Sequence, residues 1–154
     1  MDLKEFKNSI PSLVEQAIET AHNITDAKTT LTSDISDIDK MDEIVRYIHN
    51  LRKKNLIDDD VSWNISVSFG TLLGEMIINE HKYHWALNDD EIPVVETDDH
   101  DRLSPITKLY KIITDEEDCE GSPSGFYKGF LAIKQYNAMN DEDKEKITTY
   151  IKEE

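Results

Sequence analysis

Cysteine is almost absent from this sequence, which excludes a fold held together by internal disulfides. The chain has 154 residues and one cysteine, Cys119, and a single thiol has no partner within the chain. Its first ten residues, MDLKEFKNSI, lack the apolar run of a signal peptide. No stretch of the sequence approaches the ~18 consecutive apolar residues of a membrane-spanning helix. These absences together predict a soluble, cytoplasmic protein.

Basic residues are scarce relative to acidic ones. Lysine and arginine total 17 against 33 aspartate and glutamate residues, so the formal net charge is −16. A surface of this sign repels phosphate backbones and anionic lipid, which disfavours binding to nucleic acids and to membranes. It attracts a basic protein and speeds the encounter at low salt. The charge therefore predicts either a basic protein partner or a surface charged for solubility alone.

The usual catalytic and metal-binding motifs are also missing. The sequence contains no P-loop, dinucleotide-binding fingerprint, G-x-S-x-G elbow, HExxH motif or EF-hand loop. Cys119 lies among acidic residues at 115–120, whose negative charges disfavour the reactive thiolate. His81 and His84 are three residues apart and would face one ion only if a helix continued through both. The sequence therefore predicts no cofactor and no metal.

Apolar residues at helical spacing are the main pattern in the sequence. Gaps of three and four recur along most of the chain, and each such run predicts a helix. We expect Pro11 to break the first run, because proline lacks the amide hydrogen that a helix interior needs. Residues 23–37, rich in threonine, serine and aspartate, predict a loop. The expected helices cover residues 3–21 (interrupted), 39–55, 61–80, 105–113, 126–139 and 141–151.

Two short β-prone runs interrupt this pattern. Residues 83–87 and 92–97 are separated by the turn-forming sequence Asn-Asp-Asp-Glu at 88–91. We expect an antiparallel hairpin that packs against the helices, because two isolated strands are marginally stable. Pro93 predicts that the second strand lies at the edge of the sheet.

The helix expected at 61–80 is apolar around most of its circumference, which is typical of a central, buried helix. Its two interior glycines, Gly70 and Gly74, each cost roughly 1 kcal/mol relative to alanine. We expect another element to approach closely at both. A polar stripe completes the helix, and we expect it to face water, with a ligand site centred on Glu75 as the alternative. The stripe consists of Asn64, Ser68, Thr71, Glu75 and Asn79.

The fold class that follows is α+β, mostly helical, with a small antiparallel hairpin packed against a central buried helix. We expect residues 1–154 to form a single domain. Within it, residues 1–57 supply N-terminal helices, residues 58–139 the central helix, hairpin and following helices, and residues 140–154 a C-terminal helix.

Acidic residues cluster in two segments of the second half. Residues 89–101 contain seven acids and no lysine or arginine, and residues 115–120 contain five acids. If the fold brings these segments together, they form one negative face to which a cationic protein could dock. Otherwise they are simply solvated. The candidate binding residues are Asp89, Asp90, Glu91, Asp98, Asp99, Asp101, Asp115, Glu116, Glu117 and Asp118.

One sequence pattern extends across the middle of the chain. W-x6-G-x-x-L-G-E begins at Trp63 and ends at Glu75, and is followed by Trp85, Pro93-Val94 and Ser-Pro-x3-Leu-Tyr-Lys at 104–111. The pattern resembles small bacterial domains of uncharacterised function over roughly residues 60–130. Comparable small acidic proteins are immunity partners of secreted toxins. The resemblance implies a shared fold more than a shared activity, and it carries over no catalytic residue.

The leading hypothesis is a non-enzymatic protein that engages a basic partner, with toxin neutralisation as one specific form. A small-ligand or metal-dependent enzyme built around Glu75, His81 and His84 is the alternative. A structural subunit without a separable activity is the third. The sequence leaves the partner's identity and the oligomeric state open.

Overall fold

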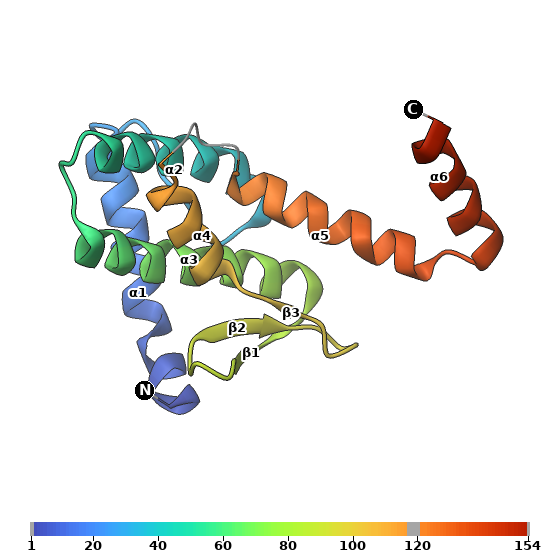
Figure 1. Cartoon of the computed structure of the whole chain (residues 1–154). Coiled ribbons are helices and arrows are strands. Elements are labelled where there is room, and N and C mark those ends of the chain that lie inside the picture. The colour runs from blue at the N-terminus through green and yellow to red at the C-terminus, as the bar shows by residue number, and fades with distance from the viewer. Residues whose placement is uncertain (1, 117–120, 154) are drawn as a thin grey trace.

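The computed structural model describes residues 2–116 and 121–153, and it consists mostly of helices with one small sheet (Figure 1). This architecture confirms the mostly helical α+β fold class. The elements are α1 (Leu3–Ile24), the short 3-10 helix η1 (Ile35–Asp37), α2 (Ile38–Lys53), α3 (Asp59–His81), β1 (His84–Leu87), β2 (Pro93–Glu96), β3 (Arg102–Leu103), α4 (Pro105–Thr114), α5 (Pro123–Ala138) and α6 (Asp141–Glu153).

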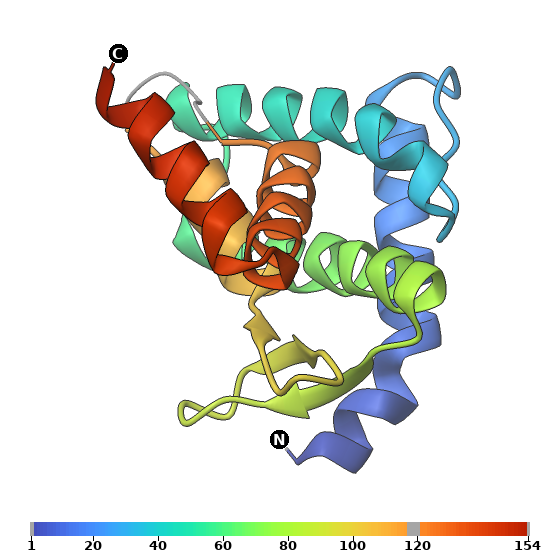
Figure 2. The same ribbon diagram turned by 90° about the vertical axis from the view of Figure 1, so that its right-hand side faces the viewer.

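Helix α3 is the central helix, and both α4 and α1 pack against it at an angle (Figures 1 and 2). Many of its apolar side chains are fully buried and join those of α1, α2 and α4 in one core, whereas Val61, near its start, is exposed. The prediction of a buried central helix is confirmed. The fully buried side chains of α3 include Phe69, Leu72, Leu73, Met76 and Ile77.

Both interior glycines of α3 lie where a neighbour leaves no room for a side chain. A Cβ on Gly70 would lie 2.6 Å from the Cα atom of Ile106, in α4. A Cβ on Gly74 would lie 2.2 Å from Cη2 of Trp85, in β1. Glycine therefore lets the backbone of α4 approach at the first position and the indole ring at the second. The expected close approach is confirmed at both.

The sheet is an antiparallel meander in the order β1–β2–β3. Trp85 pairs with Val95, which pairs on its other side with Leu103. The expected hairpin is present, but β2 is the central strand, so the prediction that Pro93 places it at the edge is wrong. Pro93 is the first residue of β2, whereas β3 pairs only with Val95 and Glu96. The missing N–H of proline therefore falls outside the β2–β3 ladder.

Helix α1 continues through Pro11, so the predicted break is also wrong. Pro11 is exposed and has no N–H to donate to the carbonyl of Lys7, so water can donate to that carbonyl instead. Phe6 on one side of the proline and Ala17 on the other are both buried. Packing of both halves against the core thus keeps the helix intact, with a bend near its N-terminal end (Figure 1).

Side-chain caps fix several helix starts. Asp58 accepts a hydrogen bond from the backbone N–H of Val61 at 2.9 Å, and Asn140 accepts one from Asp143 at 2.8 Å, as expected for N-caps. Ser104, although followed by proline as expected, makes no side-chain cap. Helix α5 begins earlier than predicted, because the hydroxyl of Ser122 caps it and proline occupies its first turn.

Two polar contacts fix the start of α5 and the end of α4 to α2. Asp42 accepts hydrogen bonds from the backbone N–H of Ser124, at 2.9 Å, and from its hydroxyl. Nδ1 of His49 donates to the carbonyl oxygens of Ile112 and Ile113, at 3.0 and 3.2 Å. These contacts position the N-terminal half of α5 beside the body of the molecule.

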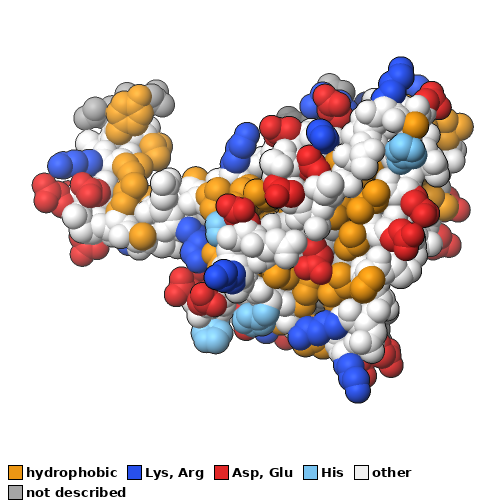
Figure 3. Space-filling view, turned by 180° about the vertical axis from the view of Figure 1, so that it is seen from behind, with side chains coloured by type: hydrophobic (Ala, Val, Ile, Leu, Met, Phe, Trp, Pro, Cys, Tyr) orange, Lys and Arg blue, Asp and Glu red, His pale blue; other side chains and the backbone are white. Residues whose placement is uncertain are grey.

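The outer half of α5 projects from the body, and α6 turns back from its far end (Figures 1 and 2). Tyr150 and Ile151 of α6 are 64 % and 65 % exposed. Hydrophobic side chains are visible over this projecting arm in Figure 3. The core of the protein therefore lies within the body, and the arm adds little to it.

Candidate functional site

Glu75, the only acidic residue in the interior of α3, lies half-buried beside Trp85. Burial raises the pKa of the Glu75 carboxyl, and the indole N–H of Trp85 offsets part of that rise by favouring the ionised form. Nε1 of Trp85 is buried and completes no hydrogen bond with any described residue. The indole therefore acts on the carboxyl at longer range than a hydrogen bond. Within the described residues, neither a cation nor a second carboxylate contributes to the shift, so Glu75 has no charged partner of an acid–base pair among them.

The rest of the polar stripe is only partly solvated, in contrast to the expectation. Asn64 and Asn79 are exposed, whereas Ser68 and Thr71 are buried. The hydroxyls of Ser68 and Thr71 donate to carbonyls of their own helix, at 3.0 and 2.7 Å. Hydroxyls satisfied in this way are compatible with burial in a helix and have no donor left for a ligand. The stripe thus belongs to the scaffold.

We expect Glu75→Gln to raise the melting temperature near neutral pH. Because the pKa of the folded state lies above the ordinary value of 4.5, the fold favours the protonated carboxyl. The stability it contributes is complete below that ordinary value and is lost as the pH rises through the raised pKa. Glutamine removes the charge, so its advantage should grow over the same interval and vanish in acid. Thermal unfolding across this pH range measures it, with Glu80→Gln, an exposed neighbour on α3, as the control. A lower melting temperature of Glu75→Gln near neutral pH would show that the carboxylate is stabilising.

The two histidines near the end of α3 have separate partners. Nε2 of His81 lies 2.7 Å from the hydroxyl of Tyr127, and its ring stacks on Tyr83. Nε2 of His84 lies 3.2 Å from a carboxylate oxygen of Glu96. Over residues 2–116 and 121–153, histidine, cysteine and acidic side chains form no group of three that could hold a metal ion.

Six of the seven acidic residues at 89–101 lie in two turns at opposite ends of the sheet, and the seventh, Glu96, lies in β2 between them (Figure 1). The turn at 88–92 joins β1 to β2, and the turn at 97–101 joins β2 to β3. Consecutive turns of an antiparallel meander necessarily alternate between its two ends. These two turns therefore do not form one continuous negative face. We call them the first and second acidic turns.

The third acidic segment lies elsewhere again. Asp115 and Glu116 follow α4 and line a hollow together with Arg52 and Lys53, at the end of α2. Glu117 and Asp118, like Cys119, fall outside the described residues. Two basic side chains thus accompany the described part of this segment.

Side-chain hydrogen bonds hold both acidic turns. In the first, Oδ1 of Asn88 accepts the N–H groups of Asp90 and Ile92, each at 2.9 Å. In the second, the buried Thr97 accepts the N–H of Asp101 at 3.2 Å through its hydroxyl and donates its own N–H to the Asp101 carbonyl at 2.9 Å. The turns therefore present their carboxylates from a fixed backbone.

Most carboxylates of the two acidic turns form no ion pair with the described residues, whereas the carboxylate of Glu96, in the strand between the turns, does. Glu96 in β2 pairs with Arg102 at 3.0 Å and also with His84, and these contacts lower the pKa of its carboxyl. Asp99 lies 3.6 Å from Lys134. The described residues form no ion pair with the remaining acids of the two turns, which are all exposed: Asp89, Asp90, Glu91, Asp98 and Asp101.

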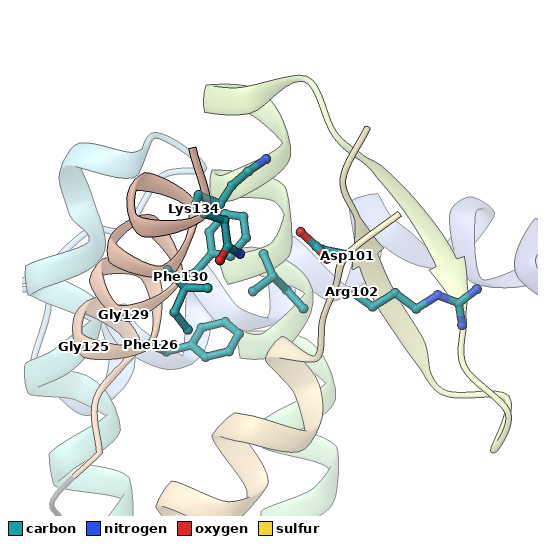
Figure 4. Close-up of a pocket in the computed structure, with 10 residues that line it drawn as sticks. Asp101, Arg102, Gly125, Phe126, Gly129, Phe130 and Lys134 are labelled. Carbon is teal, nitrogen blue, oxygen red and sulfur yellow. The ribbon is translucent and has the colours of Figure 1, made fainter. Parts of the chain in front are cut away.

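A groove of about 430 Å³ separates α5 from β3 and the second acidic turn (Figure 4). Apolar side chains form most of its lining: Leu103, Phe126, Phe130 and Ile133. Gly125 and Gly129 of α5 also line it, and Asp101 lines it from the other side with its carboxylate toward α5 (Figure 4). We call it the α5 groove.

The sequence predicts the aromatic residues of α5 only as a helix face and gives no prediction of the α5 groove. The available signal is the spacing of Gly125 and Gly129, which lie four residues apart and so share a helix face with the aromatic side chains. The missing side chain of Gly129 leaves part of the space that the groove occupies, because a Cβ there would meet no other atom within 4 Å.

Helix α3 is long and apolar enough, by length and composition, to cross a membrane, and no other helix in the described residues is. The expectation that no segment approaches a membrane span is corrected to this extent. Most of α3 is buried inside the protein, and core helices of folded domains have the same composition, so the finding is weak evidence for a span.

Comparisons of the chain with protein-family models, with characterised proteins and with experimental structures found no match.

Proposed function

We propose that this protein is a non-enzymatic binding domain for a basic protein, with neutralisation of a toxin as one specific form. The observation that carries the proposal is the pair of acidic turns. Each holds exposed carboxylates on a backbone fixed by side-chain hydrogen bonds, and most of them have no cation among the described residues.

The overall charge and its placement act together in this proposal. A net charge of −16 attracts a cationic protein over the Debye length, which is about 8 Å at physiological salt. The carboxylates of the turns then determine where the partner docks, because they are already oriented. Charge complementarity of this kind gives specificity and a fast, salt-dependent association rate.

The titratable groups of the described residues support a binding role better than a catalytic one. Glu75 has no charged partner, and His81 and His84 pair with different side chains. A catalytic acid–base pair or metal site needs such groups to converge on one cleft. We therefore do not adopt the enzyme centred on these three residues, and no observation favours a purely structural subunit.

Capture of basic proteins from the producing cell onto the immobilised protein tests the proposal. We expect proteins of high isoelectric point to bind at low salt and to elute as the salt concentration rises. Asp98→Asn with Asp101→Asn, and separately Asp89→Asn with Asp90→Asn, should weaken capture of such a partner by about tenfold if its cations contact that turn. Glu15→Gln with Glu19→Gln on the exposed face of α1 changes the net charge equally and is the matched control.

Two outcomes would contradict the proposal. One is that no basic protein binds the wild-type chain at low salt. The other is that the α1 control weakens capture as strongly as both turn variants, because binding would then depend only on net charge.

A further inference from the structure

We propose that the α5 groove receives a short segment of the basic partner, with a lysine or arginine side chain lying along its apolar wall and ending at Asp101. This inference rests on the proposed function and specifies which part of the surface makes the contact. Four observations carry it: the lining, the orientation of the charges, the empty space at Gly129 and the adjoining acidic turn.

The lining suits the stem of a long cationic side chain. Phe126, Phe130 and Ile133 present apolar surface over a volume of about 430 Å³, which exceeds that of a single side chain. Lysine and arginine bury their aliphatic stems against such surface and keep the charged end at the rim. A cation within about 6 Å of an aromatic ring is further attracted by it, and Phe126 offers such a ring, since that of Phe130 already faces Lys134.

The charges around the α5 groove favour a cation over an anion. Two basic residues, Arg102 and Lys134, belong to the lining, and both already have acceptors within the protein. Arg102 donates to Glu96 at 3.0 Å and to the carbonyl of Leu87 at 3.2 Å. Lys134 donates to the hydroxyl of Tyr83 at 3.0 Å, and its Nζ lies 5.6 Å from the centroid of the Phe130 ring. In Figure 4 the guanidinium of Arg102 points away from α5, whereas the carboxylate of Asp101 points toward it.

Gly129 has no structural reason to be glycine. A Cβ on Gly70, Gly74, Gly121 or Gly125 would meet another atom of the protein within 4 Å, whereas a Cβ on Gly129 would meet none. Glycine in a helix interior destabilises it relative to alanine. Glycine at this position therefore does not stabilise the fold. It does leave room for a ligand in the space that a side chain would occupy.

The second acidic turn adjoins the α5 groove and extends the contact. Asp98 is exposed, and Asp99 is 75 % exposed and pairs with Lys134 at 3.6 Å, so both remain accessible next to Asp101. A segment with one cation in the groove would bring its neighbouring cations to these carboxylates. The occupant is therefore a basic stretch rather than an isolated lysine or arginine.

Gly129→Leu tests the assignment, with Gly129→Ala as the matched control. Leucine fills the groove and favours the helix, whereas alanine favours the helix and fills little space. Both variants should keep or raise the melting temperature. Binding is measured by fluorescence anisotropy with two labelled synthetic peptides of equal positive charge, one of lysine, arginine and leucine, the other of lysine, serine and glycine.

We expect the leucine-containing peptide to bind the wild type more tightly at low salt. Its affinity should fall at least about tenfold in Gly129→Leu, change less than about twofold in Gly129→Ala, and fall about threefold in Asp101→Asn. Asp89→Asn with Asp90→Asn, at the far end of the sheet, should leave it unchanged.

The results separate this inference from the function on which it rests. If basic proteins or peptides bind the wild type and Gly129→Leu equally, the binding function stands and the groove assignment is wrong. If neither peptide nor any basic protein binds the wild type, both are wrong. Sedimentation provides the remaining check: a wild-type dimer that Gly129→Leu converts to monomer would assign the groove to a second copy of the chain and overturn the proposal.

Discussion

Gly70→Ala should lower the free energy of unfolding by about 3 kcal/mol, although alanine favours a helix over glycine. The new methyl group would lie 2.6 Å from the Cα atom and 2.8 Å from the backbone nitrogen of Ile106. Backbone atoms of a packed helix have no alternative rotamer, so α4 as a whole would have to move away from α3. Denaturant unfolding monitored by circular dichroism measures the change.

Two controls identify the cause of this loss. Gly129→Ala, where the methyl group meets open space, should instead stabilise the protein by up to about 1 kcal/mol. Ile106→Ala should not rescue Gly70→Ala, because the conflicting Cα and N atoms remain. A stable Gly70→Ala protein would contradict the close packing of α3 on α4.

Gly74→Ala should cost about 2 kcal/mol for a different reason, since its obstacle is a side chain. The added methyl group would lie 2.2 and 2.4 Å from two ring carbons of Trp85. The indole is 5 % exposed and meets the ring of Phe6 edge to face, with centroids 4.9 Å apart. It therefore has little room to shift.

A double-mutant cycle distinguishes this site from Gly70. Trp85→Leu alone should destabilise the protein by about 3 kcal/mol, because a large buried ring is lost. In that background, Gly74→Ala should become neutral or stabilising, which corresponds to a coupling energy of about 2 kcal/mol. If Gly74→Ala costs the same in both backgrounds, the indole is not the obstacle.

The sequence predicts that Gly70 and Gly74 have close neighbours, but it does not predict which residues those neighbours are. The apolar circumference of residues 61–80 and the cost of an interior glycine are local properties, and both were sufficient to predict a buried helix with close neighbours. The identity of those neighbours, Ile106 and Trp85, depends on how distant segments pack. No periodicity within one helix contains that information.

The wrong predictions have the same origin. Pro11 and Pro93 are local signals for a break and an edge, but packing on both sides of Pro11 and the short pairing of β3 override them. A strand as short as Arg102–Leu103 has no alternation to detect. The single acidic face required residues 89–101 and 115–120 to come together, whereas the meander places the two acidic turns within residues 89–101 at opposite ends of the sheet.

We propose that the scaffold and the recognition surface are separate parts of the molecule. Helix α3, with Glu75 at the edge of the core, holds the molecule together. In the proposed function, the second acidic turn and the α5 groove engage the partner. The raised pKa of Glu75 then reflects burial rather than catalysis.

Backbone amide hydrogen exchange, with and without the leucine-containing basic peptide, tests this separation most directly. The account predicts new protection over residues 98–103 and 125–137, with exchange over residues 64–79 unchanged. Protection confined to residues 64–79 around Glu75, with none along the second acidic turn or α5, would contradict it.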